Sequence, residues 1–218
     1  MADQLPRTLN TIDMKAYKLL LLIALTAGIA ACSKEDATKD YGFAKVYIPQ
    51  ATVTGIDNSY PIPLGPFGQN SKYTCSYDAA SGKLDIALGV IRSGYFAVQK
   101  GYSVSLGISA DLTAAKVAEV GGVALPAAVC TIPGTITVPD GESGASVKVS
   151  VDLKALAAQS ATFKDAEGYK KLVLGLAISN LQGPSDYSLA DSNTSVAIIL
   201  DLGSEYWTDD VRALFPLD

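Results

Sequence analysis

Short segments in which apolar and polar residues alternate restrict this chain to β-structure more strongly than any other feature of its sequence. The clearest is segment 145–153, where every second residue from Val147 to Leu153 is apolar and the residues between them are polar. Successive side chains of a strand point to opposite faces of its sheet, so the pattern predicts a strand with one buried and one wet face. Segments 83–91 and 102–109 alternate in the same way and predict two more such strands.

Segments 171–179 and 194–202 are apolar on both faces. Such runs are typical of central strands that are covered on both sides. Weaker strand patterns lie at 43–51 and 71–77. The inward-facing residues of these strands predict a common core that includes Ile86, Leu88, Val104, Leu106, Val147, Val149, Val151, Leu174, Leu176, Ile198 and Leu200.

Turn residues separate the strands. The sequence Pro-Asp-Gly-Glu-Ser at 139–143 predicts a hairpin that pairs segment 135–138 with segment 145–153, because Gly141 can adopt the positive φ of a tight turn.

Two segments favour short helices instead. Segment 111–120 consists of good helix formers, with Asp111 as candidate N-cap and Gly121 as a stop. Segment 153–159 predicts a second helix of one or two turns. Many short strands with one or two short helices predict an all-β, antiparallel β-sandwich.

The segment from Met14 to Cys32 predicts export. Lys15 and Lys18 precede an apolar run at 19–31, which is shorter than the roughly 20 residues that a transmembrane helix needs. Residues 29–32, Ile-Ala-Ala-Cys, resemble the lipobox of bacterial lipoproteins, which implies cleavage before Cys32 and lipid attachment to its sulfur. The alternatives are an ordinary signal peptide and an uncleaved buried helix.

We therefore divide the chain into five parts. Residues 1–13 contain acidic residues that do not suit a signal, so we expect a mis-called translation start there, with Met14 as the true start. Residues 14–31 are the lipoprotein signal peptide. We expect residues 32–42 to form a lipidated tether, 43–203 the sandwich and 204–218 a C-terminal tail.

A family resemblance covers about 44–202. The segments that carry it are 46–51 (Val-Tyr-Ile-Pro-Gln-Ala), 90–94, 102–106, 125–126, 136–141 and 145–149. In this order they resemble an N-terminal domain of Bacteroidota surface lipoproteins, the domain of unknown function 1735 type. The resemblance implies an immunoglobulin-like β-sandwich in a protein that is anchored in the outer membrane and exposed at the surface; the alternative is a protein that faces the periplasm. Such proteins are often encoded in glycan-utilisation loci. The mixed-charge residues after Cys32 also resemble the surface-export signal of such lipoproteins, and the alternative is a plain flexible linker.

Composition excludes several classes of function. The chain has no histidine, which removes the usual nucleophile-activating base and most zinc sites, and we expect no cofactor and no metal. The formal net charge of −5 opposes binding of nucleic acid. Acidic residues fall mainly in turns and on wet strand faces, as with Asp140 and Asp85. We therefore do not expect an enzyme.

Aromatic side chains are the remaining candidates for a binding surface, because a sugar ring stacks on the apolar face of Tyr, Phe or Trp. For Trp207, the alternative is that it seals the end of the sandwich. The candidate ligand contacts lie in loops and after the last strand; they are Tyr60, Phe67, Tyr95, Phe96, Tyr206 and Trp207.

Cys75 and Cys130 remain once Cys32 carries lipid. An even pair in an exported chain is a candidate disulfide, and the alternative is two free core thiols.

Two functions follow as expectations. In the first, the protein is a non-catalytic surface lipoprotein, attached to the membrane through lipid on Cys32, that binds polysaccharide as an accessory to glycan use. In the second, it is a spacer, adhesin-like or protein-interaction module that contacts another surface protein; the presence of a single Trp favours this alternative.

Overall fold

The computed structural model describes residues 43–65, 74–94 and 98–217. These belong to one compact unit, residues 41–218. Cys32 and the other residues of segment 1–42 lie outside the described residues, so the predictions for the signal and the tether stay predictions.

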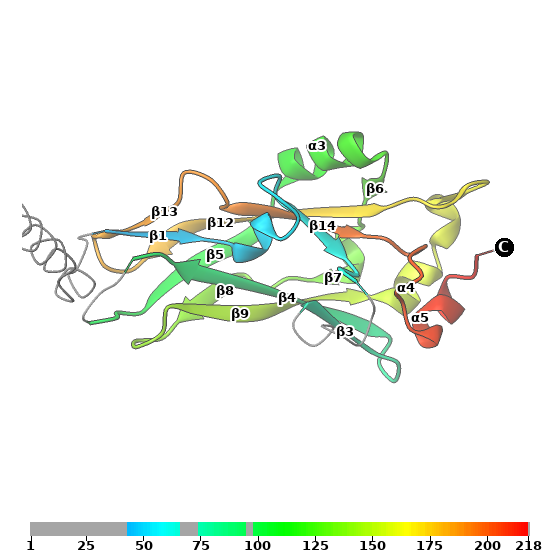
Figure 1. Cartoon of the computed structure of the whole chain (residues 1–218). Coiled ribbons are helices and arrows are strands. Elements are labelled where there is room, and N and C mark those ends of the chain that lie inside the picture. Colours follow the sequence, from blue (N-terminus) through cyan, green and yellow to red (C-terminus); the bar gives the residue numbers. More distant parts are fainter. Residues whose placement is uncertain (1–42, 66–73, 95–97, 218) are drawn as a thin grey trace, which may run out of the picture. The chain divides into compact units, whose positions relative to one another are not determined.

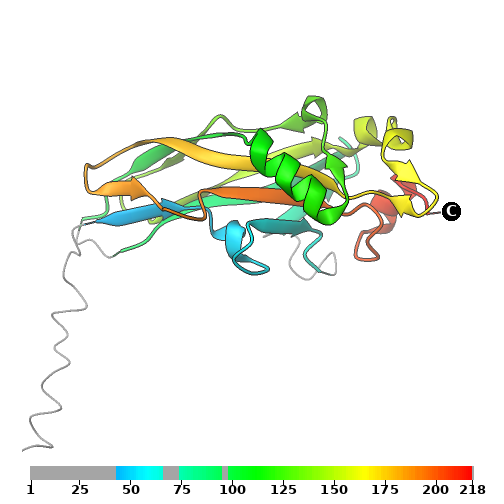
Figure 2. The same ribbon diagram turned by 90° about the horizontal axis from the view of Figure 1, so that it is seen from above.

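Two sheets stack face to face around one core (Figures 1 and 2). In the first sheet the strand order is β13 (Tyr187–Leu189), β1 (Ala44–Tyr47), β4 (Lys83–Arg92), β9 (Gly144–Asp152) and β7 (Cys130–Thr131), and β3 (Cys75–Asp78) also pairs with β4. In the second sheet the order is β2 (Ser59–Ile62), β14 (Ser195–Leu200), β12 (Leu172–Gln182), β5 (Tyr102–Ile108) and β8 (Thr135–Val138), and β6 (Val123–Ala124) pairs with β12.

Short helices and one small hairpin complete the unit. The α-helices are α3 (Ala110–Val120), α4 (Leu153–Ala157) and α5 (Asp209–Leu214), and β10 (Lys164–Asp165) pairs with β11 (Gly168–Tyr169). Three single 3-10 turns are η2 (Pro49–Thr52), η3 (Ala127–Val129) and η4 (Ser160–Thr162). No helix among the described ranges has the length and apolar character needed to cross a membrane.

The alternating segments form the strands that they predict, and the all-β sandwich is confirmed. The longest ladder joins β4 and β9 from Lys83↔Asp152 to Ile91↔Gly144, and places the apolar residues of both strands on the inner face. Every residue of the predicted core is buried except Val147, which is half-buried and packs against that core. The sheets are not purely antiparallel, because the β1–β13, β2–β14 and β6–β12 pairs run parallel.

The predicted hairpin at 139–143 is wrong. Gly141 does have a positive φ, 86°, and the chain does reverse. However, β8 pairs with β5 in the second sheet, while β9 pairs with β4 in the first. The turn therefore crosses between the sheets, because a tight turn reverses the chain without requiring its flanking strands to bond to each other.

Helix α3 lies on the outer face of the second sheet, over β12 and β14 (Figure 2). Its N-cap is Ser109, whose Oγ accepts a hydrogen bond from Leu112 N at 3.3 Å, rather than the predicted Asp111. Gly121 ends the helix in the left-handed conformation, as predicted. Because the helix covers Val173 and Ile199, the β12–β14 pair is buried on both faces.

The predicted C-terminal tail is part of the sandwich domain. With α5, the described part of the chain contains three α-helices, whereas one or two were predicted. Trp207, Val211 and Phe215 from this segment are all at most 2% exposed. The acidic residues at 209–210 occupy the first turn of α5, where negative charge is favourable.

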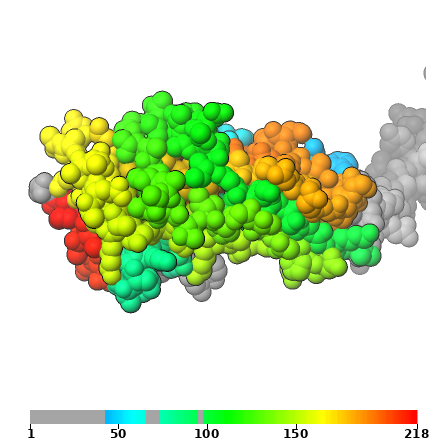
Figure 3. Space-filling view, turned by 180° about the vertical axis from the view of Figure 1, so that it is seen from behind, coloured from blue at the N-terminus to red at the C-terminus, as the bar shows by residue number. Residues whose placement is uncertain are grey.

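The sandwich has two ends that differ in structure. The entry end contains the start of β1, the β12–β13 loop and the 139–143 turn. The helical end contains α4, α5 and the β10–β11 hairpin. Seen from behind in Figure 3, residues 183–190 (orange) and α5 (red) lie at opposite ends.

Candidate functional site

Tyr60 does not belong to a binding surface, and its prediction as a ligand contact is wrong. It is 1% exposed, and its hydroxyl lies 3.1 Å from Thr74 O and 3.2 Å from Ala87 O. On this edge of β4, the residues between those that pair with β1 and those that pair with β3 have no neighbouring strand, and Tyr60 fills this gap. Gln50 Oε1 accepts a hydrogen bond from Gly89 N at 3.2 Å in the same gap. Two side chains thus take the place of a neighbouring strand, which explains why an aromatic with a polar tip is buried here.

Trp207 is also buried, at 2% exposure, and its prediction as a ligand contact is wrong as well. Its indole Nε1 donates a hydrogen bond to Asp201 O at 2.7 Å. The ring therefore closes the helical end of the core, which was the alternative interpretation of its position. Its neighbour Tyr206 is exposed, at 42%. Of the candidate aromatics in the described residues, Tyr206 alone faces solvent.

Three candidate aromatics, Phe67, Tyr95 and Phe96, lie outside the described residues. Their roles as ligand contacts therefore stay predictions. The described chain resumes at Val98, directly after residues 95–97, and Val98 is 70% exposed.

The candidate disulfide between Cys75 and Cys130 is wrong, because both thiols are free. Cys75 lies on β3 and Cys130 on β7, with β4 and β9 between them. Three strand spacings amount to roughly 14 Å, well beyond the Cα separation of a disulfide. Burial raises the pKa of each thiol to about 11, so both behave as small core side chains.

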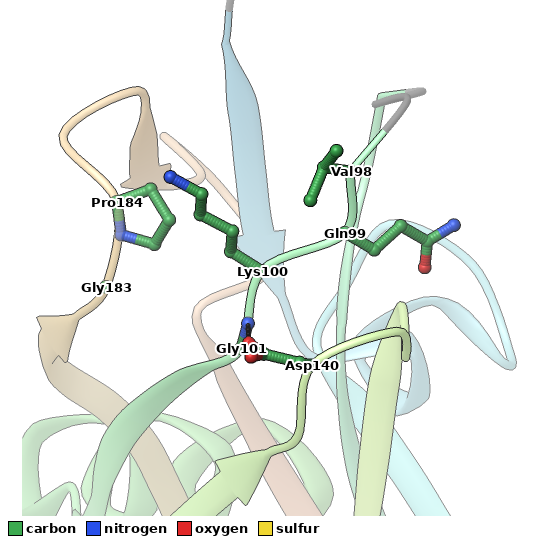
Figure 4. Close-up of a pocket in the computed structure, with 7 residues that line it drawn as sticks. All are labelled: Val98, Gln99, Lys100, Gly101, Asp140, Gly183 and Pro184. Carbon is green, nitrogen blue, oxygen red and sulfur yellow. Dashed lines mark hydrogen bonds between the residues drawn. The ribbon is translucent and has the colours of Figure 1, made fainter.

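A groove of about 530 Å³ opens at the entry end. Three segments that are far apart in the sequence contribute to it: the end of the β4–β5 loop, the 139–143 turn and the β12–β13 loop. Figure 4 shows Lys100 extending toward Pro184, with Val98 on the other side of the groove. Its lining residues are Val98, Gln99, Lys100, Gly101, Asp140, Gly183 and Pro184. None of them was predicted as a ligand contact, since neither their spacing nor their type forms a motif.

Close backbone packing holds the groove in place. A Cβ at Gly101 would lie 2.6 Å from Val138 O, and a Cβ at Gly183 would lie 2.9 Å from Tyr102 Cβ, so both positions require glycine. Asp140 Oδ1 accepts a hydrogen bond from Gly101 N (Figure 4).

Further hydrogen bonds connect the same loops. Gly141 N donates to Gln99 O at 2.8 Å, and the hydroxyl of Tyr187 donates to Lys100 O at 3.2 Å. The described lining is thus a preformed surface, which reduces the conformational entropy lost when a ligand binds.

Aromatic and cationic groups lie behind the groove. The guanidinium carbon of Arg92 is 5.6 Å from the centre of the Tyr187 ring, and this ring packs edge-on against Tyr102 with 5.8 Å between ring centres. Arg92 is 4% exposed. Burial raises the pKa of Tyr102 to about 12, so the hydroxyl stays neutral.

Asp85 and Asp152, two acidic residues outside the groove, have structural partners. Asp85 accepts hydrogen bonds from the Ser150 hydroxyl (2.6 Å) and from Lys148 Nζ (3.0 Å), and these hold the pKa of its carboxyl below the usual value. Asp152 caps α4 by accepting from Ala155 N at 2.9 Å. In the described ranges, no three His, Cys, Asp or Glu side chains gather closely enough to hold a metal ion.

A second hollow, of about 430 Å³, lies at the helical end beside the β10–β11 hairpin. Its charged groups include Asp165 and Lys170, which form an ion pair at 3.5 Å. Tyr169, which also lines it, donates its hydroxyl proton to Pro216 O at 3.2 Å. Because Asp165, Lys170 and the Tyr169 hydroxyl already have partners within the protein, this hollow is a weaker candidate than the groove.

No protein-family model and no curated protein matches the sequence. Among solved structures, the chain is similar to a Bacteroides ovatus protein of unknown function, with 18% identity, a TM-score of 0.45 and coverage of 72% of this chain and 45% of that one. A multidomain Bacteroides ovatus protein that includes a domain of unknown function 1735 is similar at 16% identity and a TM-score of 0.40, over 72% of this chain and 43% of that one.

A third similar structure, from Bacteroides ovatus, is a candidate carbohydrate-binding protein, with 14% identity, a TM-score of 0.43 and coverage of 72% of this chain and 36% of that one. The chain thus spans less than half the length of each of these three proteins. At such identities and scores the likeness says nothing about what this chain binds.

Proposed function

We propose that this protein is a non-catalytic lipoprotein, anchored through Cys32 in the outer membrane and exposed at the cell surface, that binds polysaccharide as an accessory to glycan use. The groove at the entry end is its proposed binding site. The observation that carries the proposal is this preformed groove.

The chemistry of the groove supports a sugar ligand. Val98 and Pro184 offer apolar walls for the C–H face of a sugar ring, while Gln99, Lys100 and Asp140 offer hydrogen-bonding groups. Small-ligand sites commonly combine apolar walls with a few placed polar groups. The lipobox-like segment supports the anchor, since it would hold the compact unit at a membrane surface.

A binding assay tests this function. The chain from Ser33 onward contains the whole compact unit and can be screened against neutral and acidic polysaccharides by affinity gel electrophoresis. The double substitution Val98→Ala and Gln99→Ala should weaken the affinity for polysaccharide by about tenfold, equivalent to roughly 1.4 kcal/mol. Ile56→Ala is the matched control, because Ile56 is 89% exposed and does not line the groove.

The burial of Tyr60 and Trp207 favours a second candidate function, a spacer or protein-interaction module. Tyr206 is then the one exposed candidate aromatic in the described residues. A single ring is a small surface for stacking on sugars. Absence of retention on every polysaccharide would remove the first proposal and leave this one.

A further inference from the structure

We propose that the groove at the entry end selects acidic polysaccharides, those whose sugar rings carry carboxylate groups, and that Lys100 is the residue that recognises the carboxylate. This inference rests on the proposed function, and it names the class of glycan. It follows from the charges around Lys100.

Lys100 places an uncompensated ammonium group in the groove. Its side chain extends toward Pro184 (Figure 4), and among the residues that the structure describes its Nζ makes neither a hydrogen bond nor an ion pair. Lys83 and Lys171 are alike in this respect, but neither lines the groove. Carboxylate or carbonyl oxygens hold the other described lysines, which are Lys45, Lys116, Lys148, Lys154, Lys164 and Lys170.

Lys100 is the one cationic side chain among the described lining residues of the groove. Asp140 is the one carboxylate among its described lining residues, and its Oδ1 is bound to Gly101 N. The ring of Tyr187, whose hydroxyl donates to Lys100 O, also packs against the buried Arg92. Glu142 and Asp186 lie in the same loops but do not line the groove.

A carboxylated sugar satisfies both features of the site. Its ring can contact the apolar walls at Val98 and Pro184, while its carboxylate accepts a charge-assisted hydrogen bond from Lys100 Nζ. A neutral sugar offers the ammonium only hydroxyl or ester oxygens, which carry no charge to pair with it. Because hydrogen bonds to charged groups exceed neutral ones in strength, we expect about a tenfold preference for the acidic ligand.

The test uses one polymer in two charge states. Polygalacturonate carries a carboxylate on every ring, and its methyl ester has the same backbone without that charge. The chain from Ser33 onward should bind polygalacturonate about tenfold more tightly than the ester, and added salt should reduce the difference.

Three variants assign the preference to Lys100. Lys100→Gln should abolish it and Lys100→Arg should keep most of it. Lys83→Gln removes the same charge from an exposed lysine outside the groove, so it should leave the preference unchanged. Alginate, a second carboxylated polymer, should respond to these substitutions in the same way.

The failures are distinguishable. Equal binding of polygalacturonate and its ester, or an equal loss in Lys83→Gln and Lys100→Gln, would overturn the role of Lys100 while leaving polysaccharide binding intact. Absence of binding to both acidic and neutral polymers would overturn the proposed function as well.

Discussion

Gly175, at the centre of β12, allows α3 to lie directly on the sheet. A Cβ at this position would lie 2.7 Å from Ser109 O, 2.7 Å from Thr113 N and 2.8 Å from Thr113 Oγ1. The same contact contains two hydrogen bonds: Gly175 N donates to Thr113 Oγ1 at 2.9 Å, and Ser109 N donates to Gly175 O at 2.8 Å. Gly175→Ala should therefore push the first turn of α3 away from β12.

The expected cost is about 2–3 kcal/mol of unfolding free energy. Overpacking a well-packed contact costs about 1–3 kcal/mol, and two of the three atoms that the new methyl meets are backbone atoms, which cannot rotate away. In a domain of this size such a loss lowers Tm by roughly 4–12 °C. Urea unfolding followed by circular dichroism measures it, and the m-value should not change if the native fold is kept.

Gly107→Ala is the matched control. Gly107 lies on β5, the strand next to β12, and pairs with Ala177 of β12. A Cβ at Gly107 would meet nothing within 4 Å. Alanine at this position should be neutral or stabilise by up to about 1 kcal/mol, because glycine in a strand loses more backbone entropy on folding. If Gly175→Ala were as stable as Gly107→Ala, the close packing of α3 on β12 would be refuted.

Three further predictions concern other parts of the chain. Trp207→Ala should cost about 3–5 kcal/mol in a urea titration, whereas Trp207→Phe should cost about 1–3 kcal/mol, mainly through the unpaired Asp201 carbonyl; a change below 1 kcal/mol for alanine would contradict burial of the ring. Cys75 and Cys130 should stay unreactive toward iodoacetamide at pH 8 until the protein unfolds. Since burial raises both pKa values from 9.0 to about 11, the unfolded chain loses these protons first, and stability should fall as the pH rises from about 9 to 11; rapid labelling of folded protein would count against this. Intact-mass analysis of membrane-extracted protein should show a chain that starts at a diacylated Cys32, and an uncleaved or unmodified chain would disprove the lipobox assignment.

Aromatic residues were the least reliable part of the sequence analysis. Tyr60 and Trp207 lie in segments that look like loops or tails, yet one closes a gap in a sheet and the other closes an end of the core. An aromatic ring with one polar atom suits both an exposed binding surface and a buried site with a hydrogen-bond acceptor. Only the position of carbonyls such as Ala87 O and Asp201 O distinguishes the two.

Local sequence patterns are enough to predict the strands and the faces that they bury. The alternation at 145–153 and the run at 171–179, which is apolar on both faces, are local patterns. Because burial of apolar surface drives folding, these patterns predict which side chains are buried. Gly121 likewise ended α3 as predicted, because its left-handed conformation needs no distant partner.

Which segments meet depends instead on the three-dimensional fold. It sent β8 and β9 to different sheets, separated the two cysteines by two strands, and built the groove from loops around Lys100, Asp140 and Gly183. These outcomes depend on hydrogen bonds and packing between residues far apart in the chain, whose register no local pattern records. The lysine that we propose as the recognition residue is therefore inconspicuous in the sequence and becomes distinctive only through its neighbours.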